Sequence, residues 1–182
     1  IADKLNQLND ERRSIEATVQ IQALEQVEKM DSNSALAWAA GEGWHPGVVG
    51  IVASRIKEIT NKPTVVIGLD EHEGKGSGRS ISGIDLGSSI ATLQRENLII
   101  RGGGHKMAAG LSLEREKLEI AMSRLNELLA NQGSKSFQTR ELQLDGALSL
   151  PAITIELLEQ LETAGPFGAG APGPRFALVA GT

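Results

Sequence analysis

The chain begins with hydrophobic residues spaced as in one long amphipathic helix. Their spacing alternates between four and three residues, apart from Arg12, and neither glycine nor proline occurs before Gly41. The hydrophobic stripe consists of Ile1, Leu5, Leu8, Ile15 and Val19. The pattern predicts a helix over residues 2–30, which either packs on its own domain or connects to an upstream one. Because the chain starts at Ile1, already inside this pattern, we expect it to be part of a longer protein.

Strand-like runs and helical periods then alternate as far as residue 131. Strands are predicted at residues 35–40, 64–68, 78–82, 98–100 and 107–113, with a polar turn at residues 70–76. Helices are predicted at residues 45–61, 86–94 and 114–131. Pro46 suits the first position of a helix, and Pro63 ends that helix. The alternation indicates the α/β fold class.

The last third of the chain has a weaker pattern. Residues 132–140 are polar and have no regular period, which is typical of a linker. Beyond them, residues 142–150 read as extended chain and residues 154–162 as a short helix. So short a segment with so few strands can hardly close a core alone. We therefore interpret residues 141–182 as the start of a truncated second domain.

Composition limits the partners that the chain can have. It has 182 residues, 40% of them hydrophobic, a formal net charge of -5 and no cysteine. The charge argues against a uniformly basic surface, and an aromatic content of 3% argues against a platform for stacking bases, so any nucleic-acid contact is local. No hydrophobic run reaches the roughly 20 residues that span a bilayer, and there is no signal-peptide pattern. We expect a cytoplasmic protein with no membrane partner.

One stretch has the composition of a phosphate-binding segment. Three consecutive glycines, residues 102–104, are followed by His105 and Lys106. Glycine lacks a β-carbon, so an anion can approach the backbone N–H groups closely, and the two cationic side chains can add charge and hydrogen bonds. The same composition is also common in mobile loops.

Two further patches indicate the same chemistry. His45 and Pro46 begin a predicted helix, whose N-terminus favours anions through its N–H groups and partial positive charge. Arg79 lies between Ser77 and Ser80, and Gly78 allows a phosphate to approach. Each patch has an ordinary alternative, which is a helix cap for the histidine, a surface ion pair for the arginine and a turn for the Ser-Gly pair. Their occurrence together in one α/β domain favours phosphate binding.

Four blocks of this sequence, in order and at similar spacing, resemble the RecJ family of single-strand-specific exonucleases. They span residues 43–55, 76–80, 103–110 and 165–170. The first three resemble the DHHA1 module, and the fourth resembles the start of the OB-like domain that follows it. The resemblance implies a linking helix at residues 1–33, a DHHA1-type domain with a mixed central sheet flanked by helices at residues 34–131, and a truncated OB-like segment at residues 141–182.

The resemblance also implies that the metal site lies elsewhere. Members of the family hydrolyse single-stranded DNA from its 5′ end in DNA repair and recombination, using Mn²⁺ or Mg²⁺ held by an upstream DHH domain. This chain has no Asp-His-His run, and its nearest acidic group, residues 70–73, fits a solvated turn better than a metal site. We therefore expect no metal site and no catalytic residue in this fragment, and no cleavage of DNA by it alone.

By similarity, the phosphate next to the scissile bond would be held by His105, Arg79 and the amides of Gly103 and Gly104. Arg55 and His45, at the start of its helix, would steer the strand, and Ser77 and Ser80 would add hydroxyl groups. Two alternatives stay open: a DHH phosphodiesterase that acts on oligonucleotides or dinucleotides, and a nucleic-acid-binding module without catalysis.

Overall fold

The computed structural model describes residues 2–133, 142–168 and 171–179. By its internal contacts the chain divides into two compact units, residues 1–137 and residues 138–182. Within the described residues, no helix is both long and apolar enough to cross a bilayer.

A five-stranded mixed sheet forms the centre of the first unit, as the α/β pattern and the family resemblance predict. Its strands are β1 (Ala37–Glu42), β2 (Thr64–Leu69), β3 (Glu73–Arg79), β4 (Arg101–His105) and β5 (Ala108–Glu114), in the spatial order β1-β2-β3-β5-β4. Strands β1 and β2 are parallel, and all other neighbours are antiparallel. Strand β4 is therefore an edge strand.

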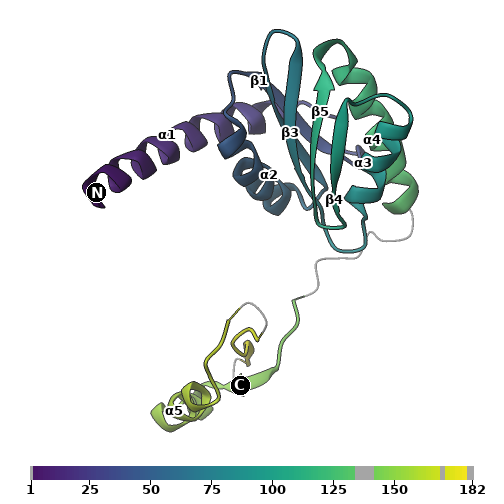
Figure 1. Ribbon diagram of the computed structural model, residues 1–182. Helices are drawn as coiled ribbons and strands as arrows, with labels where there is room; N and C mark the ends of the chain where they lie inside the picture. Colours follow the sequence, from purple (N-terminus) through teal and green to yellow (C-terminus); the bar gives the residue numbers. More distant parts are fainter. Residues whose placement is uncertain (1, 134–141, 169–170, 180–182) are drawn as a thin grey trace. The chain divides into compact units, whose positions relative to one another are not determined.

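Helices cover the two faces of this sheet (Figure 1). The helices α1 (Ala2–Val27) and α2 (Pro46–Thr60) lie on one side, and α3 (Leu86–Arg95) and α4 (Leu118–Gly133) lie on the other. A short 3₁₀ turn, Arg115–Lys117, precedes α4. The core between the sheet and the helices α3 and α4 includes Ile67, Leu86, Leu113 and Leu125. This core accounts for the strong apolar stripe along α4.

The core on the α1 and α2 side is narrower. Its sheet residues come from β1 and β2 only: Ala37, Ala39 and Val66. Along β3, β5 and β4, successive side chains point alternately to the two sides of the sheet. Those on the α1/α2 side are small, polar or charged, whereas the alternate positions face the core under α3 and α4. We call the α1/α2 side of β3, β5 and β4 the open face.

Two sequence predictions about the strands are wrong. Strand β3 begins at Glu73, so the predicted turn over residues 70–76 shrinks to residues 70–72. The glycine run forms β4 itself, rather than a loop between strands at residues 98–100 and 107–113. Both errors have one cause: glycine lowers strand propensity, but here cross-strand pairing and close packing override it.

The stripe predicted for the first helix is also mostly wrong. Leu5, Leu8 and Ile15 are exposed, whereas Glu16, Val19 and Ala23 are buried. Only the second half of α1 packs on the sheet and α2, and it uses a helix face shifted from the predicted one. Ile1 lies outside the described residues.

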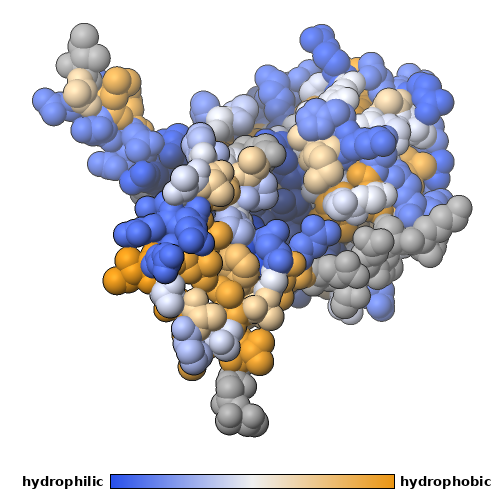
Figure 2. Space-filling model, turned by 90° about the horizontal axis from the view of Figure 1, so that it is seen from below, coloured by the Kyte–Doolittle hydropathy of each residue, from blue (hydrophilic) through white to orange (hydrophobic). Residues whose placement is uncertain are grey.

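The described residues of the second unit form two short parallel strands and one α-helix. Strand β6 (Gly146–Ser149) pairs with β7 (Phe176–Val179), and α5 (Ile155–Thr163) follows the 3₁₀ turn Leu150–Ala152. Several large apolar side chains of this unit are exposed, among them Leu142, Ile155 and Leu178. Figure 2 shows hydrophobic residues gathered on this unit. The predicted linker at residues 132–140 lies largely outside the described residues.

Candidate phosphate-binding site

Two cross-strand rows on the open face bring the predicted phosphate ligands together. Residues directly opposite one another in neighbouring strands point to the same side of a sheet. One row contains Arg79, Ala108 and His105, and the next contains Ser77, Gly110 and Gly103. Arg79 and His105 are thus two strands apart, or about 10 Å between Cα atoms. Their side chains are long enough to reach one oxyanion between them.

Arg79 is held in place without a neutralising partner. Its Nη1 donates to Oγ of Ser77 at 3.1 Å and to the carbonyl oxygen of Gly78 at 2.9 Å. Within the described part of the chain, no carboxylate lies within ion-pair distance of the guanidinium. The side chain is half-buried. A positioned arginine with free donors and no counter-ion is suited to binding an external anion.

The glycines in the row next to Arg79 and His105 form an open floor. A β-carbon added to Gly103 would meet nothing within 4 Å, and one added to Gly110 would meet only the carbonyl oxygen of Gly76, at 3.9 Å. Both glycines are exposed. An anion can therefore approach the backbone of β4 and β5 without displacing a side chain.

The other glycines of the motifs serve packing. A β-carbon on Gly78 would lie 2.7 Å from Cδ2 of Leu86, so Gly78 faces the helical core and not the open face; its predicted role in admitting a phosphate is wrong. A β-carbon on Gly104 would lie 2.3 Å from the carbonyl oxygen of Ala108. Gly104 is therefore required by the close approach of β4 to β5.

The amides of the glycine run differ in direction. The N–H of Gly102 points off the sheet edge, where it donates to Oε1 of Gln94 at 3.3 Å. Because successive N–H groups of a strand alternate in direction, that of Gly104 also points off the edge and that of Gly103 points toward β5. The predicted pair of amides thus does not converge on one anion.

Two histidines, His105 and His45, each present a free Nε2 donor. Nδ1 of His105 accepts a hydrogen bond from the N–H of Met107 at 3.3 Å, and Nδ1 of His45 accepts one from the N–H of Gly47 at 3.0 Å. In the neutral ring the proton is then on Nε2, which is left to donate outward. Both side chains are exposed.

His45 also caps α2, as its ordinary alternative role predicts. Its side chain accepts a hydrogen bond from the N–H of Gly47, and its carbonyl oxygen accepts from the N–H of Val48 at 2.9 Å and of Val49 at 3.4 Å. Pro46 has no N–H. The first-turn amides are therefore already used, and what α2 can offer an anion is its dipole and Nε2 of His45.

Sequence reasoning missed Gly50, which connects α2 to this site. A β-carbon on Gly50 would lie 3.1 Å from Oγ of Ser77 and 3.2 Å from Nη2 of Arg79. The signal was present, because a glycine in the interior of a helix lowers stability by about 0.5–1 kcal/mol relative to alanine and usually has a packing reason.

Two of the predicted ligands do not lie free at this site. Ser80 is 1% exposed, and its hydroxyl donates to the carbonyl oxygen of Ile84 at 3.0 Å. Arg55 forms an ion pair with buried Glu16 on α1 at 2.5 Å and donates to Oε1 of Gln20 at 3.2 Å. Burial excludes Ser80 from binding a phosphate, and the contacts of Arg55 connect α2 to α1.

Residues 70–72 form an exposed turn, as the sequence analysis predicts for the acidic group, and Glu73 is the first residue of β3. Oδ1 of Asp70 accepts from the N–H of Glu73 at 2.7 Å and of His72 at 3.0 Å, and these bonds lower the pKa of Asp70. Among the residues that the structure describes, no cluster of three or more histidine, aspartate or glutamate side chains could hold a metal ion.

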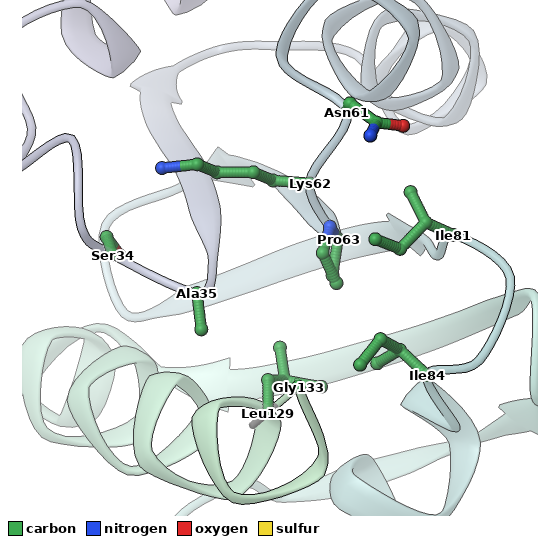
Figure 3. Close-up of a pocket in the computed structure, with 9 residues that line it drawn as sticks. All are labelled: Ser34, Ala35, Asn61, Lys62, Pro63, Ile81, Ile84, Leu129 and Gly133. Carbon is green, nitrogen blue, oxygen red and sulfur yellow. The ribbon is translucent and has the colours of Figure 1, made fainter. Parts of the chain in front are cut away.

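A pocket elsewhere in the first unit is too small for a nucleotide. Ala35, Pro63, Ile81, Ile84 and Leu129 are among its lining residues, and Figure 3 shows several of these apolar side chains turned into it. Its cavity volume is about 30 Å³, room for about one water molecule. We interpret it as a packing defect of the core.

Comparison with known proteins adds the family context. The model of the DHHA1 domain matches residues 21–131. The chain is 38% identical to "Single-stranded-DNA-specific exonuclease RecJ" of Escherichia coli K12, over 97% of the chain and 32% of that protein. It is 35% identical to the protein of the same name in Bacillus subtilis, over 96% of the chain and 22% of that protein.

A solved structure resembles the fold over nearly the whole chain. The crystal structure of RecJ in complex with Mn²⁺ from Thermus thermophilus matches with a TM-score of 0.81 and 29% identity, covering 97% of this chain and 25% of that one. A Mg²⁺ complex from the same organism matches with a TM-score of 0.79, covering 94% of this chain and 26% of that one. The chain spans about a third or less of the length of these relatives.

Proposed function

Because this chain belongs to the DHHA1 domain family, we propose that it is the part of a single-stranded-DNA-specific exonuclease that binds the phosphate backbone of the substrate. The RecJ relatives match nearly all of the chain, whereas the chain accounts for only part of each relative. The proposal assigns binding to this chain and the hydrolytic chemistry to another part of the same polypeptide, an upstream DHH domain.

One observation carries this proposal. Arg79 is half-buried and positioned by Ser77 and Gly78, with no carboxylate partner among the described residues. It lies in one cross-strand row with His105, beside the exposed glycines Gly110 and Gly103 of the next row. A phosphate above Gly110 and Gly103 would receive hydrogen bonds from both side chains. Each charge-assisted bond contributes roughly 1.5–3 kcal/mol.

The role of such a site in catalysis is to hold the substrate. Fixing one phosphate positions the ester to be cleaved, and the positive charge of Arg79 offsets negative charge on the phosphate oxygens. The two RecJ crystal structures contain Mn²⁺ or Mg²⁺. We propose that the full-length protein uses such an ion outside this chain, because no ligand cluster for it occurs in the described residues.

The experiment is a binding titration of this chain with a fluorescent oligothymidylate at several salt concentrations. If two or three phosphates are neutralised, the logarithm of affinity falls with the logarithm of salt with a slope of about -1.4 to -2.1. Arg79→Gln and His105→Ala should each weaken binding by about tenfold, and Arg79→Gln should make the slope shallower by about 0.7. Parental affinity and slope in both variants would disprove the assignment.

Activity separates this proposal from its rivals. The chain alone should bind the oligonucleotide without cutting it. When it is expressed with its natural upstream sequence, we expect metal-dependent digestion of single strands from the 5′ end. Cleavage restricted to dinucleotides would indicate a related phosphodiesterase, and binding without any cleavage would indicate a binding module.

A further inference from the structure

The open face continues beyond the two rows that hold Arg79 and Ser77. The next row along the strands contains Lys75, Ser112 and Arg101, directly opposite one another on β3, β5 and β4. We propose that Lys75 and Arg101 form a second phosphate-binding position for the same DNA strand. This inference rests on the proposed function, because it takes Arg79 and His105 as the first position.

The distance between the positions suits two phosphates better than one. Lys75 and Arg79 are four residues apart on one strand, which corresponds to about 13 Å between Cα atoms. Side chains of a strand stand roughly perpendicular to the sheet, so the charged ends of the two rows stay near this distance, and two phosphates of one strand fit them without either side chain leaning along the strand. In the row between them, Gly110 on β5 and Gly103 on β4 have no side chain that would block the strand, whereas Ser77 on β3 lies against Gly50 of α2.

Both cations of the second position are available to a ligand. Lys75 and Arg101 are exposed, and neither forms an ion pair within the described ranges of the chain. They are two strands apart, about 10 Å between Cα atoms, as Arg79 and His105 are in the first position. The hydroxyl of Ser112 lies between them in the row and can donate one more hydrogen bond.

The start of α2 adds positive potential here. Gly68 is the cross-strand partner of Lys75 on β2, and a β-carbon on Gly68 would overlap the carbonyl oxygen of Trp44. The residue after Trp44 is His45, so the N-terminus of α2 lies above β2, next to Lys75. Its partial positive charge and Nε2 of His45 both favour an anion at this end of the open face.

An acidic row marks the end of the basic track. Glu73 and Glu114 are directly opposite one another on β3 and β5, on the same side of the sheet as Lys75 and Ser112. Their charges would repel a phosphate placed beyond the second position. The open face therefore provides two positions, which suits an oligonucleotide better than a mononucleotide.

The test is a charge-removing double variant, Lys75→Gln/Arg101→Gln, compared with Lys4→Gln/Lys29→Gln, which removes the same charge from α1 and the segment after it. With a single-stranded oligothymidylate of twelve nucleotides, we expect the first variant to bind about tenfold more weakly and the salt slope to become shallower by about 0.7, because one phosphate contact is lost. The control should keep nearly the parental slope. Thymidine 5′-monophosphate, followed by NMR, should bind both variants equally, since it has one phosphate.

The outcomes distinguish this inference from the proposed function. If Arg79→Gln weakens both ligands while Lys75→Gln/Arg101→Gln behaves as the α1 control does, the second position is wrong and the first stands. If Arg79→Gln also changes nothing, the proposed function itself fails. Loss of thymidine monophosphate binding in Lys75→Gln/Arg101→Gln would also overturn the inference, because the two rows would then act on one phosphate.

Discussion

Gly50 on α2 lies directly against Arg79 on β3: a β-carbon at position 50 would be 3.2 Å from Nη2 of the guanidinium. The same β-carbon would be 3.1 Å from Oγ of Ser77, which accepts a hydrogen bond from Arg79. The absence of a side chain at this one position thus lets the guanidinium lie between the helix and the sheet. The position of Arg79 on β3 therefore depends on this contact with α2.

Side chains of increasing size at position 50 should weaken DNA binding progressively. Gly50→Ala requires Ser77 and Arg79 to shift by a few tenths of an ångström, and we expect a loss of affinity of about threefold or less. Gly50→Leu cannot be accommodated without displacing the guanidinium, and we expect about a tenfold loss. Fluorescence anisotropy with oligothymidylate measures both, and circular dichroism monitors the fold. If the folded Gly50→Leu protein bound oligothymidylate with the affinity of the parent, the positioning role of this contact would be contradicted.

Two glycines that face opposite sides of the sheet should give opposite results. Gly78→Ala places a methyl group 2.7 Å from Leu86 in the helical core, so we expect a loss of about 1–3 kcal/mol in the free energy of unfolding. Gly103→Ala meets nothing within 4 Å, so the stability should hardly change, but the methyl group would occupy the anion floor and weaken DNA binding. Urea unfolding and anisotropy on both variants check this. A Gly103→Ala protein with parental affinity would show that the phosphate does not lie on β4.

Arg55→Gln should affect the fold and leave the DNA contacts unchanged. The ion pair of Arg55 with Glu16 joins α2 to α1, and the carboxylate is buried while the guanidinium is partly exposed. We expect a loss of about 1–2 kcal/mol in stability, between the values typical of surface and buried pairs. The salt slope of DNA binding should stay the same. A slope shallower by about 0.7 would instead support the strand-steering role that the family resemblance implies for Arg55.

The turn before β3 should have a pH-dependent stability. Hydrogen bonds from the N–H groups of Glu73 and His72 lower the pKa of Asp70 from 3.8. The ionised carboxylate is therefore favoured in the folded state, and its contribution is present above the ordinary pKa and lost as the pH falls through the lowered one. Thermal melts should show the parent more stable than Asp70→Ala at neutral pH and the difference shrinking below about pH 4. A difference independent of pH would contradict this account of the turn.

Periodicity predicted those helices and strands whose side chains face one core. Strand β2 and helix α4 are apolar on their buried sides, so their positions were evident from the sequence. Strands β3 and β4 could not be located in this way, because glycine occupies their core-facing positions Gly74, Gly76, Gly78, Gly102 and Gly104. Their strand conformation is imposed by pairing with β2 and β5. Glycine itself gives no strand signal, so this pairing could not be recognised from periodicity.

The candidate site was predicted in its residue types and only partly in its geometry. Sequence reasoning placed Arg79, Ser77 and His105 at one phosphate, and the register brings them to neighbouring rows. It also included Ser80, whose burial follows from the alternation of side chains at the end of β3 and could not be known before the strand was located. Gly50 was missed because its role depends on how a helix packs across a sheet.

A crystal structure of this chain with a short 5′-phosphorylated oligothymidylate tests the central claim most directly. The account predicts one phosphate on the open face, above Gly103 and Gly110, with its oxygens about 3 Å from the guanidinium of Arg79 and from Nε2 of His105. A strand bound to another surface of the chain, with the guanidinium of Arg79 free of phosphate, would contradict it.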